Sequence, residues 1–343
     1  MAVLRAGPLA IRWDRRALVV GITLVLLSTG VLLWSLTTGD LELSVIEVVA
    51  ALTGSEDGIN RTVVVTWRLP RVFAAAVFGA GLGIAGAIFQ SLTRNPLASP
   101  DIIGFSAGAY TGALIVIIGV GGSYLQVAAG SLAGGLTTAL VVYLLAYRGG
   151  LQGFRLIVVG IGVSAMLTAA NTWMILRAQL EVAIAAAVWG AGSLNGIGWD
   201  RVAPACLATL ALAVVVARFQ PVMRVLEMGD DTAHALGVHV ERNRLILLFT
   251  AVVLTAAITA AAGPITFIAL AAPQIARRLT HSPGVTITAS ALTGALLLAS
   301  ADHAAQHLVP RVLPVGVLTV IVGGAYLIWL LIYEERHRTG GRP

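Results

Sequence analysis

Long apolar runs separated by short polar segments dominate the pattern of this chain. Because an irregular backbone would leave polar groups unpaired in hydrocarbon, each run predicts a helix. The predicted spans are residues 17–36, 70–92, 101–119, 124–147, 156–176, 201–217, 245–262, 265–279, 285–301 and 312–333. Gly263 and Pro264 predict a break where two of these helices meet. The pattern is typical of an all-α, polytopic membrane protein with about ten transmembrane helices and one domain over residues 1–343.

One polar segment interrupts the apolar pattern between two long runs. Residues 226–244 read LEMGDDTAHALGVHVERNR. The segment must lie outside the bilayer, because each buried charge would cost about 3 kcal/mol or more. Asp231 and Thr232 are expected to cap a short helix that ends at Gly237. A short capped helix between two spans is a surface that another protein can grip.

Composition excludes several classes of function. The chain is 58% hydrophobic, 11% charged and has a mean hydropathy of +0.91, which no soluble domain of this size shows. All 22 basic residues are arginine, so the chain lacks the lysine of a Walker A loop and is not itself a standard ATPase. Cys206 is the single cysteine, which excludes an internal disulfide. The net charge of +6 is scattered over loops and does not indicate nucleic-acid binding.

Charge also orients the chain in the membrane. Four arginines precede the first run, which we interpret as a retained helix with a cytoplasmic N-terminus. An acidic loop follows it and is expected outside, and the tail at residues 334–342 is expected inside. The arginines on the expected inner side are Arg94, Arg148, Arg155, Arg218, Arg224, Arg242, Arg244, Arg277 and Arg278. The exceptions, which fall outside, are Arg68, Arg71, Arg177, Arg201 and Arg311.

A glycine pattern in the second run resembles a nucleotide-binding fingerprint. Gly81, Gly83 and Gly86 spell G-x-G-x-x-G. That fingerprint requires a strand before it and a βαβ unit around it, and here it lies inside an apolar helix. Together with Gly79 the glycines give the small-xxx-small spacing that lets two helices pack backbone to backbone.

Two sets of residues have both a structural interpretation and an interpretation in transport. Asn95 and Leu97 belong to a tight cytoplasmic turn in which Asp101 is expected to cap the next helix. Asn95 is either a plain turn residue or part of an inner gate. Ser164, Thr168 and Asn171 recur at i, i+4 and i+7 in one helix and share a face. They either form hydrogen bonds between helices or line a path through the membrane.

Charged and imidazole side chains gather at the expected outer end. Arg68 and Arg71 stand on either side of Pro70. They either contact lipid headgroups or dock the acidic surface of an outside partner. Asp302, His303 and His307 fall within about a turn of one helix. No further ligands are evident nearby, so we expect a solvated cluster rather than a metal site.

Several segments together resemble the FecCD family, the iron–siderophore and vitamin B12 permeases of bacterial ABC importers. The similarity covers almost the whole chain in order and is strongest to permease subunits of the ferric enterobactin type. The matching segments are residues 67–71 (WRLPR), 86–101 (GAIFQSLTRNPLASPD), 154–162 (FRLIVVGIG), 192–199 (GSLNGIGW), 263–278 (GPITFIALAAPQIARR) and 313–316 (LPVG), besides LEMGDDTAHALGV.

The resemblance implies roles for particular residues. The cytoplasmic coupling segment, residues 222–244, would hold the helix that a partner ATPase grips. Arg68 and Arg71 would receive acids of an extracytoplasmic binding protein. A third docking arginine of some relatives falls near Gln306 in this sequence. Arg311 is the candidate that would replace it. Gln274 stands where relatives often carry histidine. The coupling residues would be Asp230, Asp231, Thr232, Ala233, Leu236, Gly237 and Val238, which match a Glu-Ala-Ala-x-x-x-Gly pattern imperfectly.

The resemblance also implies the assembly and its cargo. Two permease subunits, as a heterodimer or a homodimer, would form the pore, with two ATPase subunits inside and a siderophore-binding protein outside. The permease would bind no cofactor and no metal and would perform no catalysis, since ATP and magnesium are used by the ATPase. The location would be the bacterial cytoplasmic membrane.

Other functions stay open at this point. Heme, cobalamin or a metal ion is an alternative cargo within the family. A secondary transporter is an alternative of another class, and it requires carboxylates well inside a span. Apart from Asp302 near a helix end, we find no carboxylate well inside a predicted span. A receptor or structural membrane protein is a third class.

Overall fold

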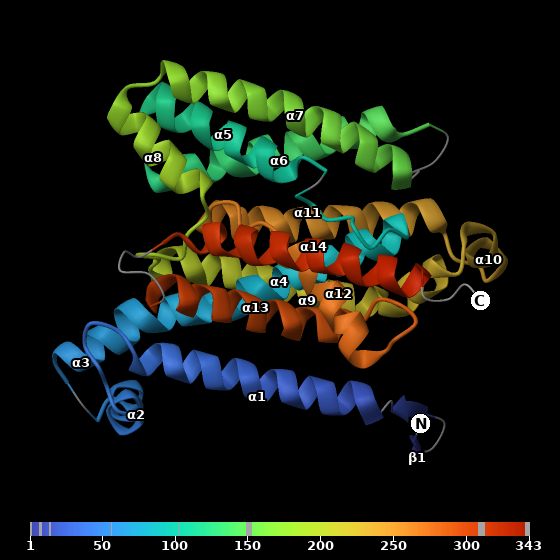
Figure 1. Cartoon of the computed structure of the whole chain (residues 1–343), viewed down its shortest axis with the longest axis horizontal. Helices are drawn as coiled ribbons and strands as arrows, with labels where there is room; N and C mark the ends of the chain where they lie inside the picture. Colours follow the sequence, from blue (N-terminus) through green and yellow to red (C-terminus); the bar gives the residue numbers. More distant parts are fainter. Residues whose placement is uncertain are drawn as a thin grey trace.

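The computed structural model describes residues 2–6, 9–13, 15–55, 57–101, 103–148, 153–307 and 313–339. Its long helices run roughly parallel to one another (Figure 1). A central group containing α4, α9, α11, α12, α13 and α14 lies between the α5–α8 group on one side and α1 on the other (Figure 1).

The N-terminal elements lie at the edge of the bundle. A hairpin of two antiparallel strands, β1 (Ala2–Ala6) and β2 (Leu9–Trp13), precedes α1 (Arg15–Thr37), which packs on α13. The short helix α2 (Val45–Thr53) follows, closed by a capping box in which Ser44 and Glu47 bond each other. Then α3 (Ile59–Arg61) and the π-helix η1 (Thr62–Arg68) lead directly into α4 (Leu69–Thr93).

The remaining elements are helices. The first group is α5 (Phe105–Val120), α6 (Tyr124–Ala146), α7 (Gly153–Arg177) and α8 (Leu180–Gly190). Next come α9 (Trp199–Glu227), α10 (Asp230–Ala235) and α11 (Val240–Ala262). The last are α12 (Ile268–Thr280), α13 (Ile287–His307) and α14 (Val315–Thr339). Apart from the hairpin, the regular structure in the described residues is helical, so the all-α prediction is confirmed in this coarser form.

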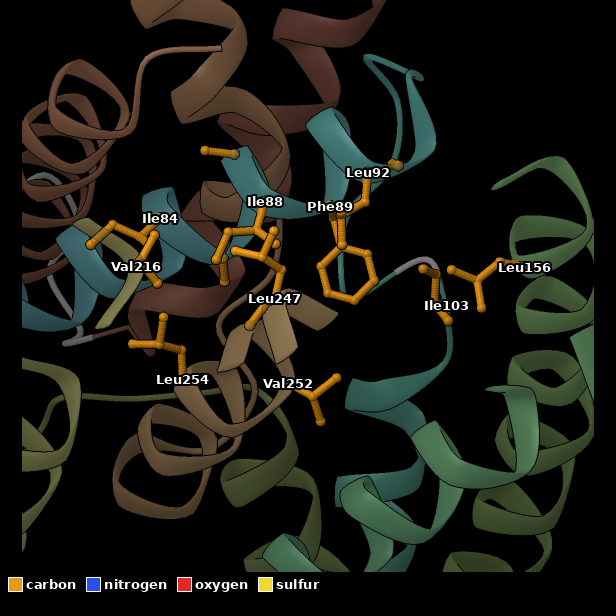
Figure 2. Packing of buried hydrophobic residues seen from close by; sticks show 14 of the residues in the cluster. Ile84, Ile88, Phe89, Leu92, Ile103, Leu156, Val216, Leu247, Val252 and Leu254 are labelled. Atoms are coloured by element: carbon orange, nitrogen blue, oxygen red, sulfur yellow. The ribbon is translucent and has the colours of Figure 1, made fainter. Parts of the chain in front are cut away.

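Helix α4 forms the centre of the core because its small residues admit neighbouring backbones. A Cβ atom on Gly79 would lie 2.4 Å from the carbonyl oxygen of Gly294 in α13, and one on Gly86 would lie 1.6 Å from that of Ala269 in α12. The predicted role of the glycine pattern in helix packing is therefore confirmed. The large side chains of α4 fill the rest: Ile84, Ile88, Phe89 and Leu92 join residues of α11 in one cluster (Figure 2).

Each of the ten predicted apolar runs coincides over most of its length with one helix in the described residues, and α11 and α12 are separated at Gly263 and Pro264 as expected. Within the part of the chain that the structure describes, six helical stretches are long and apolar enough to cross a membrane by length and composition: α1, α3 to α4, α6, α7, α9 and α11. The hairpin and helices α2, η1 and α8 were not predicted. Helix α9 also continues to Glu227, ten residues past the predicted end at residue 217, with Pro221 inside it.

Candidate functional site

The polar segment between α9 and α11 folds into the short helix α10 at one end of the bundle (Figure 1). The expected capping by Asp231 and Thr232 is wrong. Helix α10 begins after Gly229, whose φ is 116°, and no side chain caps it. The backbone takes this left-handed course freely because glycine has no Cβ atom. Asp231 and Thr232 therefore lie inside the helix with their side chains exposed.

The predicted end of α10 at Gly237 is confirmed. Gly237 has a φ of 77°, the left-handed conformation that closes a helix. Its N–H donates to the carbonyl oxygen of His234 at 3.0 Å, and the N–H of Val238 donates to that of Ala233 at 2.9 Å. Ala233 is buried in the main core cluster, whereas Leu236 keeps 61% of its surface exposed. An apolar tip on a polar segment outside the spans is suited to contact with another protein.

Asp230, the first residue of α10, is the most connected carboxylate of this segment. It accepts two hydrogen bonds from Arg244 of α11, at 3.0 and 2.6 Å, and one from Arg94 at 2.5 Å. Arg94 also donates to the carbonyl oxygen of Leu226 at 2.9 Å. Burial raises the pKa of the Asp230 carboxyl, but the hydrogen bonds from Arg244 and Arg94 outweigh it, so this pKa lies below its usual range.

The turn after α4 contains the predicted gate residues. The side-chain oxygen of Asn95 accepts a hydrogen bond from the backbone N–H of Leu97 at 2.9 Å, and Leu97 is exposed. This bond makes the turn compact without using any other element. The expected capping role of Asp101 is wrong, because α5 starts at Phe105 and Asp101 instead accepts a 2.6 Å bond from the hydroxyl of Ser106.

The polar residues of α7 differ in burial along the helix. Asn171 is buried and bonds to α5: its side-chain oxygen accepts from the Thr111 hydroxyl at 2.8 Å, and its amide donates to the Ala107 carbonyl at 3.3 Å. Of the two interpretations of Asn171, the structure therefore shows the one in which it forms hydrogen bonds between helices. Ser164 and Thr168 line an open groove of about 550 Å³ on α7 together with Thr172.

The two arginines at the opposite end of α4 are engaged within the chain. Arg71 forms a two-pronged pair with Asp302 of α13, at 2.8 and 2.9 Å. Arg68 donates to the carbonyl oxygens of Leu36 and Leu41, at 2.7 and 2.5 Å. Both line a hollow of about 460 Å³ between α1, α4 and α13. Arg311 lies outside the described residues.

The expected solvated cluster on α13 is wrong for Asp302 and His303, which are packed into the bundle, whereas His307 is exposed. Only 3% of Asp302 and 8% of His303 is exposed. The ring of His303 lies 3.0 Å from the Ser35 hydroxyl and packs between Trp34 and His307. The amide of Gln306 donates to Asp302 at 3.0 Å. The carboxylate is buried because Arg71 and Gln306 supply its hydrogen bonds.

The structure also gives Gln274 a contact that sequence reasoning missed. Its side-chain amide is buried and donates to the side-chain oxygen of Gln90 in α4 at 2.5 Å. The amide of Gln90 in turn donates to the carbonyl oxygen of Leu270 at 3.0 Å. In the sequence, Gln90 is a polar residue within an apolar run. The two arginines that bind Asp230 are charges in polar segments between the predicted spans. No local signal paired them.

The sequence of this chain is similar to those of membrane permeases. The model of the FecCD transport family matches residues 24–333. The ferric enterobactin transport system permease protein FepG of Escherichia coli is 50% identical over 326 residues, which are 95% of this chain and 99% of FepG. The achromobactin transport system permease protein CbrC of Dickeya dadantii is 37% identical over 320 residues, covering 91% of this chain and 90% of CbrC.

A solved structure shows the same fold. It is described as an inward-facing conformation of a metal-chelate type ABC transporter, and it superimposes with a TM-score of 0.81 over 92% of this chain and 99% of its own. Its sequence is 24% identical, so the similarity concerns the arrangement of helices.

Proposed function

This chain belongs to the FecCD transport family, and on that premise we propose that it is the transmembrane permease subunit of an ABC importer for ferric siderophores. The observation that carries the proposal is the match to FepG, which is 50% identical and extends over 95% of this chain and 99% of the relative. The similarity to CbrC supports the same cargo class, an iron chelate. The location would be the bacterial cytoplasmic membrane.

The proposed topology has ten spans, both termini in the cytoplasm and one permease domain over residues 1–343. The ten apolar runs that form helices support it. The acidic residues between α1 and α4 and the arginines around α10 support the orientation. Residues 222–244 then face the cytoplasm, and Arg68 and Arg71 face outward.

Residues of α10 and its C-terminal turn are proposed to contact a partner ATPase. Asp231, Thr232, Leu236 and Gly237 are exposed, while Ala233 fixes the helix to the core. ATP and magnesium would act in that partner. When two ATPase subunits close, they would push this helix, and the chain would convert the push into a change of access without covalent chemistry.

An extracytoplasmic siderophore-binding protein is proposed to dock at the outer end. Arg68 is its main contact, since Arg71 is already neutralised by Asp302. Arg71 would then hold α4 against α13 next to the docking site, and Arg311 remains a third candidate. Such electrostatic docking weakens with ionic strength.

The open face of α7 is proposed to line the path. Ser164 and Thr168 are small and polar and carry no charge, which suits a bulky chelate, and Asn95 and Leu97 would form the gate at the inner mouth. A second permease subunit would supply the opposite wall. A heterodimer with a sister permease is favoured by the likeness to FepG, and a homodimer is the alternative.

Uptake measurements in proteoliposomes test the proposed function. The chain is reconstituted with its ATPase, binding protein and any sister permease, and uptake of radiolabelled iron is followed with a panel of ferric siderophores. We expect uptake that requires ATP and the binding protein. Uptake of cobalamin, heme or free metal instead would identify the alternative cargo. Uptake driven by a proton gradient without ATP would contradict the proposal and indicate a secondary transporter.

Docking is tested separately. Replacing Arg68 with glutamate is expected to weaken binding-protein affinity at low salt, with a smaller effect at high salt because the charges are then screened. The matched control is Arg177→Glu, an exposed arginine at the end of α7 that lies outside the proposed docking site. Equal affinities of the wild-type and Arg68→Glu proteins at low salt would remove Arg68 from the docking site.

A further inference from the structure

Asp230 joins three parts of the cytoplasmic end through one carboxylate. It belongs to α10, its partner Arg244 lies in the first turns of α11, and its other partner Arg94 lies at the end of α4. The Arg244 side chain is 7% exposed, whereas those of Arg94 and Asp230 are 43% and 44% exposed. The pair with Arg244 is therefore the buried anchor, and the pair with Arg94 is the outer, accessible arm.

Arg94 is in a position to pass on a displacement. It ends α4 in the left-handed conformation, with a φ of 51°, and Asn95 follows it directly. Its guanidinium donates both to Asp230 and to the last turn of α9 at Leu226. A non-glycine residue held in this conformation is unfavourable unless its surroundings fix it. Here the two side-chain bonds do so.

The turn that follows Arg94 is a compact unit. The N–H of Arg94 donates to the carbonyl oxygen of Ser91 at 3.3 Å, the N–H of Leu97 donates to the Asn95 side chain, and the N–H of Ala98 donates to the Asn95 carbonyl. Residues 94–98 are thus tied to one another and to the end of α4. A pull on the Arg94 side chain displaces the whole turn.

Helix α10 is short and is bounded at both ends by glycine. Glycines in the positive-φ region flank it at Gly229 and Gly237. Ala233 is its buried residue, and Glu241 approaches the same anchor, 3.7 Å from Arg244. Without a side-chain tie, a six-residue helix between two glycines would swivel when pushed.

We propose that the Asp230–Arg94 ion pair is the link through which α10 moves the turn at residues 94–98, so that both are positioning residues for the inner gate. The proposal rests on the proposed coupling role of α10. It assigns Arg94 a function and gives Asp230 an inward role, distinct from the contact of Asp231 and Leu236 with the ATPase.

Arg94→Asn tests the link with little disturbance of the fold. Asparagine tolerates the left-handed conformation, and the variant leaves the buried Asp230–Arg244 pair intact. In proteoliposomes we expect ATP hydrolysis to remain and the siderophore transported per ATP to fall about fivefold or more. Arg94→Lys, which keeps a cation facing Asp230, should restore part of the ratio. The matched control is Arg218→Ala, an exposed arginine on α9, which should leave the ratio unchanged.

A cross-linking experiment tests whether the Asp230–Arg94 pair acts as a rigid link or is only a structural contact. Arg94 and Asp230 are both replaced with cysteine in a Cys206→Ala background, and a short bismaleimide joins them. If α10 and the turn move as one body, the cross-link restores the transport ratio lost in the unlinked double variant. If the two elements must separate during the cycle, the cross-link abolishes transport, and the proposal is wrong.

The outcomes distinguish this inference from the proposed function itself. Loss of ATPase copurification in Arg94→Asn would show that Arg94 is needed for assembly and would overturn its role as a link. An unchanged transport ratio in the same variant would also overturn it, while leaving siderophore import intact. Absence of ATP-driven uptake in the wild-type assembly would instead contradict the proposed function.

Discussion

Helices α4 and α7 have the same length, 25 residues, and similarly apolar sequences, yet they occupy opposite environments. In an apolar 18-residue window of the helical stretch Ile59–Thr93, which contains α4, 78% of the residues are buried, against 11% in such a window of α7. Their mean hydropathies there, 2.2 and 1.8, hardly differ. Hydropathy therefore detects a helix suited to a membrane and does not reveal whether protein or another phase surrounds it.

Small residues at a regular spacing explain the difference. Gly79, Gly83 and Gly86 of α4 each face a backbone carbonyl of α13 or α12, so three helices approach closely. On α7, a Cβ atom at Gly162 would meet nothing within 4 Å. The open face of α7 carries Ser164 and Thr168 and is the face proposed to meet a second permease. The buried helix α4 thus serves as the scaffold, and the exposed face of α7 is the surface proposed to act in transport.

The largest expected effect comes from filling the contact of α4. In Gly86→Val the new side chain would collide with the backbone of Ala269, which cannot move aside as a side chain can, so the cost should exceed about 3 kcal/mol. We expect no monodisperse protein on size-exclusion chromatography. Gly162→Val on α7 is the matched control and should elute and melt like wild type. Equal behaviour of the two variants would mean that α4 is not the packed helix.

Breaking the polar contact that holds α4 to α13 is expected to destabilise the protein without preventing it from folding. Asp302→Asn leaves Arg71 without its charged partner, and its cost should be about 3–5 kcal/mol in the free energy of unfolding. Asp200→Asn is the control, because that carboxylate is exposed and 3.8 Å from Arg201. It should cost at most about 1 kcal/mol. Titration with a denaturing detergent measures both, and similar losses would contradict the burial of Asp302.

The buried side of α7 gives the next effect. Asn171→Ala removes two hydrogen bonds between α7 and α5, although the Thr111 hydroxyl still donates to the Ala107 carbonyl, and the loss should cost about 1–3 kcal/mol. Thr172→Ala, one residue further and exposed, should change stability by about 0.5 kcal/mol or less. Thermal unfolding of the purified variants compares them. A larger loss at Thr172 would place the packed face of α7 elsewhere.

The exposed side of α7 should affect transport without affecting stability. Thr168→Leu adds apolar bulk to the groove, so stability should stay within about 0.5 kcal/mol while the uptake rate falls severalfold. Met166 is 75% exposed and lies on the other side of the helix, so Met166→Leu should leave uptake unchanged. Uptake assays with each purified variant test this. Unchanged uptake in Thr168→Leu would exclude this face as the path.

The smallest effect concerns pH at the end of α4 that contacts α10. A carboxyl whose pKa is lowered by folding contributes stability above its unfolded pKa and loses it as the pH falls through the lowered value. The pKa of Asp230 is lowered, so the stability difference between wild type and Arg94→Asn should stay constant from pH 8 to pH 5. It should shrink only near and below the ordinary aspartate value of about 3.9. A change near pH 6.5 would instead implicate a histidine.

Local pattern predicted much of this protein. Apolar runs located all ten long helices, because a backbone in hydrocarbon must satisfy its own hydrogen bonds within each segment. The glycine spacing of α4 predicted close packing, and the polar segment around α10 predicted an accessible helix that ends at Gly237. These features depend on residues within a few turns of one another.

Tertiary structure decided which polar groups meet. Asp302 was expected in solvent and is buried against Arg71, 231 residues away in the chain, and Gln274 pairs with Gln90 across 184 residues. Asp230 reaches Arg94 across 136 residues. The same approach of helices buried Asn171 against α5 and left Thr168 exposed. The sequence alone determined which segments become helices, because that choice is local. Only the packing of the helices determined the partners of their polar groups, because those contacts depend on how distant faces come together.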